Sequence, residues 1–187
     1  MRRPRRLIGP AGMGGMVGLW GASSLIKSIQ YGTTVATVAG TATATITAVD
    51  TANSVIQFLG SSSNSALNGG HWAGYCKLTN ATTVTTTYQA VTDTRTLSFC
   101  VIEYLPGVIK SKQSVTISCL FVASNTATIT SVNTAKTMIS NGGISMYLGA
   151  MDEPSRLTLT NATTVTMNRG GTSGYQTDHV GDVVEFF

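Results

Sequence analysis

The chain has 187 residues, of which 42 % are hydrophobic and only 11 % are charged. Low charge together with abundant Val and Ile argues against an intrinsically disordered chain, and the excess of β-branched residues favours strands over helices. Four of the twelve basic residues lie within the first six positions, and the others balance the eight acidic residues. The body of the protein is therefore neutral, which argues against a broad nucleic-acid-binding face.

Residues 1–25 combine a basic start with a glycine-rich apolar stretch. The glycines and Pro10 interrupt the apolar helix that a secretory signal or a membrane span would need. No Gly-Lys-Ser or Gly-Lys-Thr follows the glycines, which disfavours a phosphate-binding loop. We predict an extended anchoring arm over residues 1–25 that docks on a partner protein, with packaged nucleic acid as the alternative partner for its arginines. The predicted contact residues are Arg2, Arg3, Arg5, Arg6, Leu7, Ile8, Met13, Met16, Leu19 and Trp20.

An eight-residue block, Leu78–Thr85, returns in the same order as Leu159–Thr166. Three shorter blocks also recur, and all four are separated from their second copies by 81 to 83 residues. The shorter blocks begin at Ile26, Ala44 and Val101. A nearly constant separation is typical of an internal repeat. We therefore predict two tandem copies of one unit, with a boundary where Pro106-Gly107 would interrupt a sheet.

Short β-type runs fill both predicted copies, and no segment has convincing helical periodicity. Thr41–Val49 alternates between polar and apolar residues, as in a half-buried strand. Asp50 and its second-copy counterpart Asn133 are predicted to cap turns, because both side chains can bond to the nearby backbone. Asn80 is predicted at a bend of a strand that continues through Thr86. The expected fold is all-β: two tandem duplicated antiparallel β-sandwich-like domains, residues 26–105 and 108–187, preceded by the arm.

Two groups of residues are predicted to be buried. Leu97, Phe99 and Val101 alternate along the strand that closes the first copy, so they line one of its faces. The cysteines form no C-x-x-C pair, and their odd number argues against a disulfide framework. We interpret Cys76, Cys100 and Cys119 as small apolar residues.

The residue types that catalysis requires are present but are not grouped. His179 follows Asp178, but neighbouring residues on a strand point to opposite faces. Glu103 and Glu185 occupy equivalent repeat positions, which indicates one structural role used twice. No nucleophile motif and no zinc-ligand spacing is present. We predict a protein that is not an enzyme, with no catalytic residue, no cofactor and no metal.

One loop, residues 61–70, differs in composition between the two copies, and the residues that follow it are candidates for surface recognition. These are His71, Trp72 and Tyr75. Aromatic rings can stack on the faces of sugars, which favours glycan binding. Packing of Trp72 and Tyr75 into the core is the alternative.

The repeated blocks resemble those of a known family. They are Ile26–Gln30, Thr43–Asp50, Leu78–Thr85 and Val101–Tyr104. In this order they resemble the repeats of small β-rich virion proteins of tailed bacteriophages. The second copy departs from the pattern at Lys112 and Asn133, where the first has Ile29 and Asp50. The resemblance implies a structural virion component, assembled in the host cytoplasm.

The expected function is that of a capsid decoration or accessory protein, docked by its arm onto other virion proteins of the capsid or the tail and connector. A tail, collar or fibre protein that contributes to binding of host-surface glycans is the alternative. We also predict a homo-oligomer, because sheet edges with few charges recruit further chains. No membrane association is predicted.

Overall fold

The computed structural model describes residues 25–37, 40–64, 74–88, 94–146, 154–172 and 174–187. All but the last residue of the predicted arm lies outside these ranges. The described residues form twelve strands and two short 3-10 turns. No described helix is long and apolar enough to cross a membrane. The expectation of an all-β, antiparallel, sandwich-like fold is confirmed.

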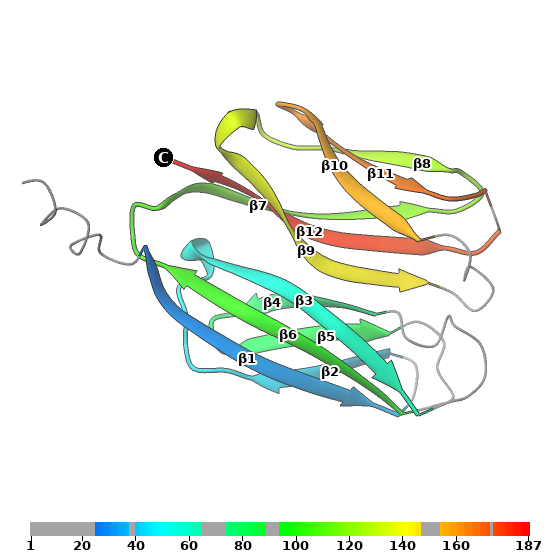
Figure 1. Ribbon diagram of the computed structural model, residues 1–187, viewed down its shortest axis with the longest axis horizontal. Coiled ribbons are helices and arrows are strands. Elements are labelled where there is room, and N and C mark those ends of the chain that lie inside the picture. Colours follow the sequence, from blue (N-terminus) through cyan, green and yellow to red (C-terminus); the bar gives the residue numbers. More distant parts are fainter. Residues whose placement is uncertain (1–24, 38–39, 65–73, 89–93, 147–153, 173) are drawn as a thin grey trace, which may run out of the picture.

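The strands divide into a first half and a second half (Figure 1). The first half contains β1 (Ile26–Ala36), β2 (Gly40–Thr45), the turn η1 (Thr51–Asn53), β3 (Ser54–Ser63), β4 (Gly74–Asn80), β5 (Thr83–Tyr88) and β6 (Arg95–Tyr104). The second half contains β7 (Ile109–Cys119), β8 (Ser124–Thr128), the turn η3 (Thr134–Lys136), β9 (Thr137–Met146), β10 (Ser155–Asn161), β11 (Thr164–Arg169) and β12 (Thr177–Phe186).

The two halves have the same strand order. In the first, β6 lies between β1 and β3, and β5 lies between β2 and β4. In the second, β12 lies between β7 and β9, and β11 lies between β8 and β10. Two residue pairs, Gly74 with Ile144 and Tyr75 with Gly143, also join β4 to β9. That the halves arose by duplication stays a prediction, as do the domain boundaries.

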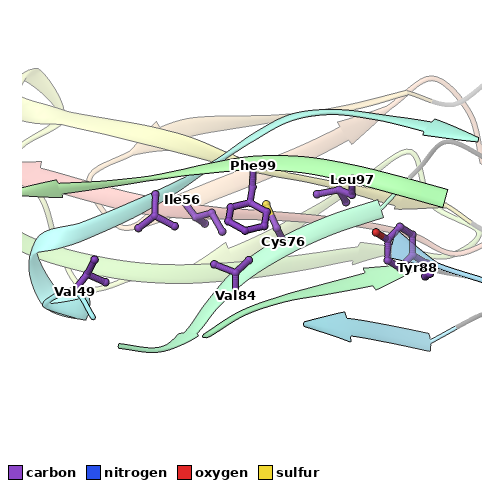
Figure 2. Close-up of a cluster of buried hydrophobic side chains, with 9 residues drawn as sticks. Val49, Ile56, Cys76, Val84, Tyr88, Leu97 and Phe99 are labelled. Atoms are coloured by element: carbon purple, nitrogen blue, oxygen red, sulfur yellow. The ribbon is translucent and has the colours of Figure 1, made fainter. Parts of the chain in front are cut away.

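Each half encloses its own core between its two sheets. In the first, Leu97, Phe99 and Val101 of β6 are fully buried and face Val84 of β5 and Cys76 of β4 (Figure 2). The predicted inner face of this strand is confirmed. In the second half, the corresponding core contains Ile117, Val165, Met167 and Val183. All three cysteines are free and buried, as expected from their spacing.

The repeated Leu78 block forms a hairpin in each half. β4 pairs with β5 through Leu78 opposite Val84, and the Asn80 side-chain oxygen accepts a hydrogen bond from the Thr82 amide at 2.9 Å. Asn161 and Thr163 repeat this contact at 2.8 Å. The expectation that the strand bends at Asn80 and continues is wrong, because this turn reverses the chain.

The predicted strand over residues 41–49 is shorter than expected and ends at Thr45. Its partner β5 begins at Thr83, so no ladder exists beyond that point. The amides of Ile46 and Val49 donate instead to the carbonyls of Thr82 and Ala81, both at 2.9 Å.

The predicted turn caps at Asp50 and Asn133 are confirmed. The Asp50 carboxylate accepts from the Ala52 amide at 2.9 Å, and the Asn133 side chain accepts from the Ala135 amide at 3.0 Å. Each residue therefore begins a 3-10 turn that leads into β3 or β9. Because the two side chains differ in charge, the bond to the backbone explains both positions.

An apolar cluster joins the two halves. Val55, Ile102 and Tyr104 of the first half pack against a group from the second. That group consists of Ile109, Met138, Val184 and Phe186. The rings of Tyr104 and Phe186 meet edge to face, with centroids 5.7 Å apart.

The chain ends that the structure describes lie beside the linker between the halves. The Leu105 amide donates to the Leu25 carbonyl at 2.9 Å, and the Phe187 amide donates to the Val108 carbonyl at 3.3 Å. The linker itself turns at Pro106-Gly107, where Gly107 has a φ of +84°. The predicted break in the sheet at this dipeptide is confirmed.

Candidate functional site

The outer face of β1 exposes a row of large apolar side chains. Ile29, Tyr31 and Val35 alternate along the strand and are 45 %, 73 % and 56 % exposed. Ile29 lies opposite Ile102, and Tyr31 lies opposite Cys100, so the row continues onto β6. We call these five residues the β1 face. Its β1 row is exposed, whereas Cys100 is buried and Ile102 packs in the cluster that joins the halves. A monomeric soluble protein rarely exposes a contiguous apolar surface without a partner for it.

The equivalent face of the second half is polar along β7, where Ser114 and Ser118 are exposed, and is covered along β12. Lys112, Ser114 and Ser118 of β7 stand where the β1 face has Ile29, Tyr31 and Val35. The Lys112 ammonium donates to the carbonyl oxygens of Thr51 and of Ser54, the latter at 2.8 Å. Burial lowers the pKa of Lys112, and the carboxylates of Asp182 and Asp50 oppose that shift.

The first half covers that face with its β3–β4 side. Lys77 of β4 donates to the Thr116 hydroxyl at 2.8 Å, and the Asn141 amide donates to the Gln57 side chain at 3.2 Å. Val180 and Val184, on the same face of β12, are 3 % and 0 % exposed. The first half therefore covers the β12 part of this face and contacts Lys112, whereas Ser114 and Ser118 of β7 stay exposed like their counterparts on β1.

A cavity of about 240 Å³ lies between the halves. Its lining includes Ile56 and Cys76 from the first half and Lys112 and Asp182 from the second. Burial raises the pKa of the Cys76 thiol to about 12. The thiol therefore stays protonated at neutral pH and is not a nucleophile.

A serine, a histidine and an asparagine are linked at the β9–β10 side of the second half. His179 Nδ1 lies 3.0 Å from the Ser155 hydroxyl, and His179 Nε2 lies 3.2 Å from the Asn141 side-chain oxygen. With that oxygen as acceptor, the proton lies on Nε2 and Nδ1 accepts from Ser155. Burial lowers the pKa of His179 to about 4.

This linked group has the residue types of a hydrolase site but not the electrostatics. An imidazole with so low a pKa is a weak base toward a serine hydroxyl. Asn141 supplies an amide, which stabilises an imidazolium less than a carboxylate would. Asp178, the neighbour of His179 in sequence, binds Gln176 instead, at 2.8 Å. The group therefore ties β10 to β9 and β12, and the prediction that His179 and Asp178 do not act as a pair fits this geometry.

Glu103 and Glu185 make equivalent contacts. Glu103 accepts from Lys27 at 2.8 Å and from the Asp50 amide at 2.9 Å. Glu185 accepts from Lys110 at 2.9 Å and from the Asn133 amide at 3.0 Å. The Asp50 amide and Lys27 lower the pKa of Glu103, and Lys110 and the Asn133 amide lower that of Glu185. The expected single structural role is therefore seen in both halves, where it fixes the turn before β3 or β9.

Most of the predicted contact residues lie outside the described residues. This holds for the ten candidates of the arm, from Arg2 to Trp20, and for His71 and Trp72. Tyr75 is half-buried on β4, and the Lys77 ammonium lies 5.4 Å from the centre of its ring. One face of this ring is thus occupied by a cation. Among the described residues, no group of His, Cys, Asp or Glu could hold a metal ion.

No protein family, curated protein or solved structure matches this chain.

The β1 face was not predicted from the sequence. The sequence does contain a sign of it, because the apolar residues Ile29, Tyr31 and Val35 stand where the second copy has the polar residues Lys112, Ser114 and Ser118. Alternation assigns these side chains to one side of the sheet, but both sides of this strand carry residues that a core accepts.

Proposed function

We propose that this chain is a non-enzymatic structural protein of a bacteriophage virion, and most specifically a capsid decoration or accessory protein that docks on neighbouring virion proteins. The observation that carries this proposal is the open β1 face. Tyr31 and Val35 are more than half exposed at its centre. A surface of this kind is typical of protein that is covered by other protein.

Unpaired strand edges support the same role. Within the part of the chain that the structure describes, six strands pair with another strand on one side only: β1, β2, β3, β7, β8 and β10. Such edges can pair with further chains, and proteins that must stay monomeric block them with charges or prolines. This chain is poor in both, with 11 % charged residues and four prolines.

The resemblance of the repeated blocks to tailed-phage virion proteins supports the assignment to a virion. A structural protein of such a particle needs rigid domains and contact surfaces rather than a reaction centre. The Ser155–His179–Asn141 group offers no competing reaction, because its imidazole is a weak base.

A tail, collar or fibre protein that binds host glycans is the second candidate. Its support is the aromatic residue Tyr75 next to the loop that differs between the halves. Lys77 already occupies one face of that ring, so a sugar would have to stack on the other face. We therefore favour the assembly role.

The test is to purify phage particles that encode this chain through a density gradient and to measure its abundance by quantitative mass spectrometry. We expect a copy number that is a fixed multiple of the known symmetry of the shell or the tail. Immunogold labelling of the same particles then separates a head from a tail location. Absence of the chain from particles purified at low salt would overturn the proposal.

A further inference from the structure

We propose that the β1 face is a docking site for a second copy of this chain, which contacts it through its own β9–β10 edge. We define that edge by Ile139, Leu157, Thr158 and Leu159. These residues are equivalent to Ile56, Cys76, Lys77 and Leu78 of the first half. The contact would join the chains head to tail.

The contact between the two halves of one chain is the basis for this inference. There, the β3–β4 side of the first half covers the outer face of β12 and β9 and contacts Lys112 and Thr116 of β7. The second half has an equivalent side, formed by β9 and β10, and the first half has an equivalent face, formed by β1, β6 and β3. Among the described residues, the β9–β10 side and the β1 row of this face remain open, whereas Val55 and Ile102 of the face pack against the second half. If a second copy repeated the contact between the halves, the β9–β10 side of one copy would cover the β1–β6–β3 face of the next.

The strand register supports the equivalence of the two faces residue by residue. Ile29 pairs with Ile102 as Lys112 pairs with Val184, and Tyr31 pairs with Cys100 as Ser114 pairs with Asp182. The pairing of β3 with β6 and that of β9 with β12 also have a register shift at the same place, beside Gly60 in β3 and beside Gly143 in β9.

Among the described residues, the glycine at the register shift contacts a covering strand in the second half but not in the first half. Gly143 has a φ of +110°, and a Cβ there would lie 2.5 Å from the carbonyl oxygen of Gly74 on the covering strand. Gly60 has a φ of +128° and would meet no described atom within 4 Å. The backbone shape that admits the covering strand in the second half is therefore repeated in the first half, where nothing described fills it.

The β9–β10 edge carries a matching recess. A cavity of about 260 Å³ is lined there by Ile139, Leu157 and His179, among others. Its counterpart in the first half is the cavity of about 240 Å³ that the second half covers, which is lined by Ile56 and Cys76. The two cavities share two equivalent lining positions, Ile139 with Ile56 and Leu157 with Cys76.

The residue differences between the halves make both the β1 face and the β9–β10 edge more apolar than their counterparts. The open face has Ile29 and Tyr31 where the covered face has Lys112 and Ser114, and the open edge has Leu157 where the covering edge has Cys76. Both partners of the proposed contact are thus more apolar than those of the contact within the chain. Leu59 stands where the covered face has Gly142, so the second copy must lie farther from β3 at this point.

A head-to-tail contact leaves a free face at one end and a free edge at the other, so it generates rings or open chains. The inference is independent of the assignment to a virion, because it uses only the contact within the chain. A chain that self-associates in this way but is absent from particles would support the inference and contradict the proposed function.

The test uses two variants of the full chain in sedimentation-velocity experiments. The face variant is Ile29→Glu with Leu59→Glu, whose equivalents Lys112 and Gly142 contact the first half. The edge variant is Thr134→Glu with Thr158→Glu, whose equivalents Thr51 and Lys77 contact the second half. All four positions are exposed, so the folded chain accepts these changes. Leu120→Glu with Val122→Glu, on the exposed turn after β7, is the matched control. Circular dichroism and thermal unfolding establish that each variant is folded.

We expect the wild type and the control to form species larger than a dimer as concentration rises. Each variant alone should be monomeric, with a dissociation constant raised about a hundredfold by unpaired charges in an apolar contact. An equimolar mixture of the two variants should form dimers and nothing larger. The intact edge of the face variant can bind the intact face of the edge variant, and no further intact surface remains.

Three results would overturn the inference. The first is a wild-type chain that stays monomeric at high concentration. This result counts against the inference whether the β1 face stays open, is covered by residues 1–24 or binds another protein. The second is association that the face variant abolishes and the edge variant does not, which indicates a face-to-face dimer. The third is a mixture of the two variants that stays monomeric.

Discussion

Lys112 of the second half donates a hydrogen bond to the carbonyl oxygen of Ser54 in the first half, at 2.8 Å. The same ammonium donates to the Thr51 carbonyl. The equivalent residue in the first half is Ile29, which is 45 % exposed. At equivalent places on equivalent strands, one residue joins the halves and the other lies at an open surface.

Replacing Lys112 by Ile should weaken the contact between the halves. The carbonyls of Thr51 and Ser54 lose their donor in a partly buried place, and we expect a loss of about 1–3 kcal/mol in the free energy of unfolding. Urea denaturation measures it. Lys136→Ile, at an exposed lysine of η3, is the control and should change the free energy by less than about 0.5 kcal/mol. Equal losses for the two lysines would contradict the role of Lys112.

The buried imidazole of His179 should make stability depend on pH below neutrality. Burial lowers its pKa from 6.5 to about 4, so in this range the unfolded chain binds a proton that the folded chain excludes. The stabilisation is fully present above pH 6.5 and is lost as the pH falls, by roughly 3 kcal/mol at pH 4. Denaturation midpoints measured between these pH values check the slope.

His179→Gln should be less stable than the wild type at neutral pH and should have a flatter pH dependence between 6.5 and 4. Thr158→Gln, at an exposed position without a titrating group, is the control and should keep the wild-type slope. If His179→Gln also keeps that slope, the imidazole titrates in the folded state and is not buried as described.

Phe99→Ala should destabilise the first half strongly. The ring is fully buried between the two sheets of that half. Truncating a buried phenylalanine to alanine removes apolar contacts and leaves a cavity, which costs about 3–5 kcal/mol. Phe187→Ala is the matched control, because Phe187 is 69 % exposed. A small effect at both positions, measured by denaturant unfolding, would argue against the core shown in Figure 2.

The two glutamates should give parallel responses to acid. The pKa of each lies below its ordinary value of 4.5 in the folded chain. Their stabilisation is therefore present above pH 4.5 and is lost as the pH falls below it. Glu103→Gln and Glu185→Gln should each lower the melting temperature at pH 7, and the difference from the wild type should shrink in acid. Opposite signs for the two variants would refute a shared structural role.

Deleting residues 2–21 should leave a folded chain that no longer joins the particle. Circular dichroism and thermal unfolding check the fold, and the protein content of purified particles checks incorporation. Salt distinguishes the two partners of the arginines, because phosphate contacts weaken steeply with ionic strength whereas apolar docking does not. Incorporation at wild-type levels would contradict the anchoring role of the arm.

Local patterns in the sequence predicted the local parts of the fold. The alternation of Leu97, Phe99 and Val101 marks a buried face, because side chains two apart on a strand share one side. Asp50 and Asn133 were predictable as caps, since their bonds reach only two residues along the chain. A change of direction at Asn80 was predictable, but the reversal of the chain there was not, because the same side-chain hydrogen bond can occur in a bend or in a hairpin turn.

Contacts between distant strands were not predictable in this way. His179 meets Ser155 and Asn141 from two other strands. Nothing in the sequence near any of the three residues indicates the other two. Lys112 was noticed as a departure from the repeat, but its partners Thr51 and Ser54 belong to a surface that exists only after both halves have folded.

The hydrogen bonds of Leu25 and Phe187 to the linker give the molecule a polarity (Figure 1). A segment attached before Leu25 and one attached after Phe187 would leave from the same pole. Strands β3 and β9 end toward the opposite pole. A molecule held close to Leu25 or Phe187 would therefore have the linker pole against its support and the other pole facing outward.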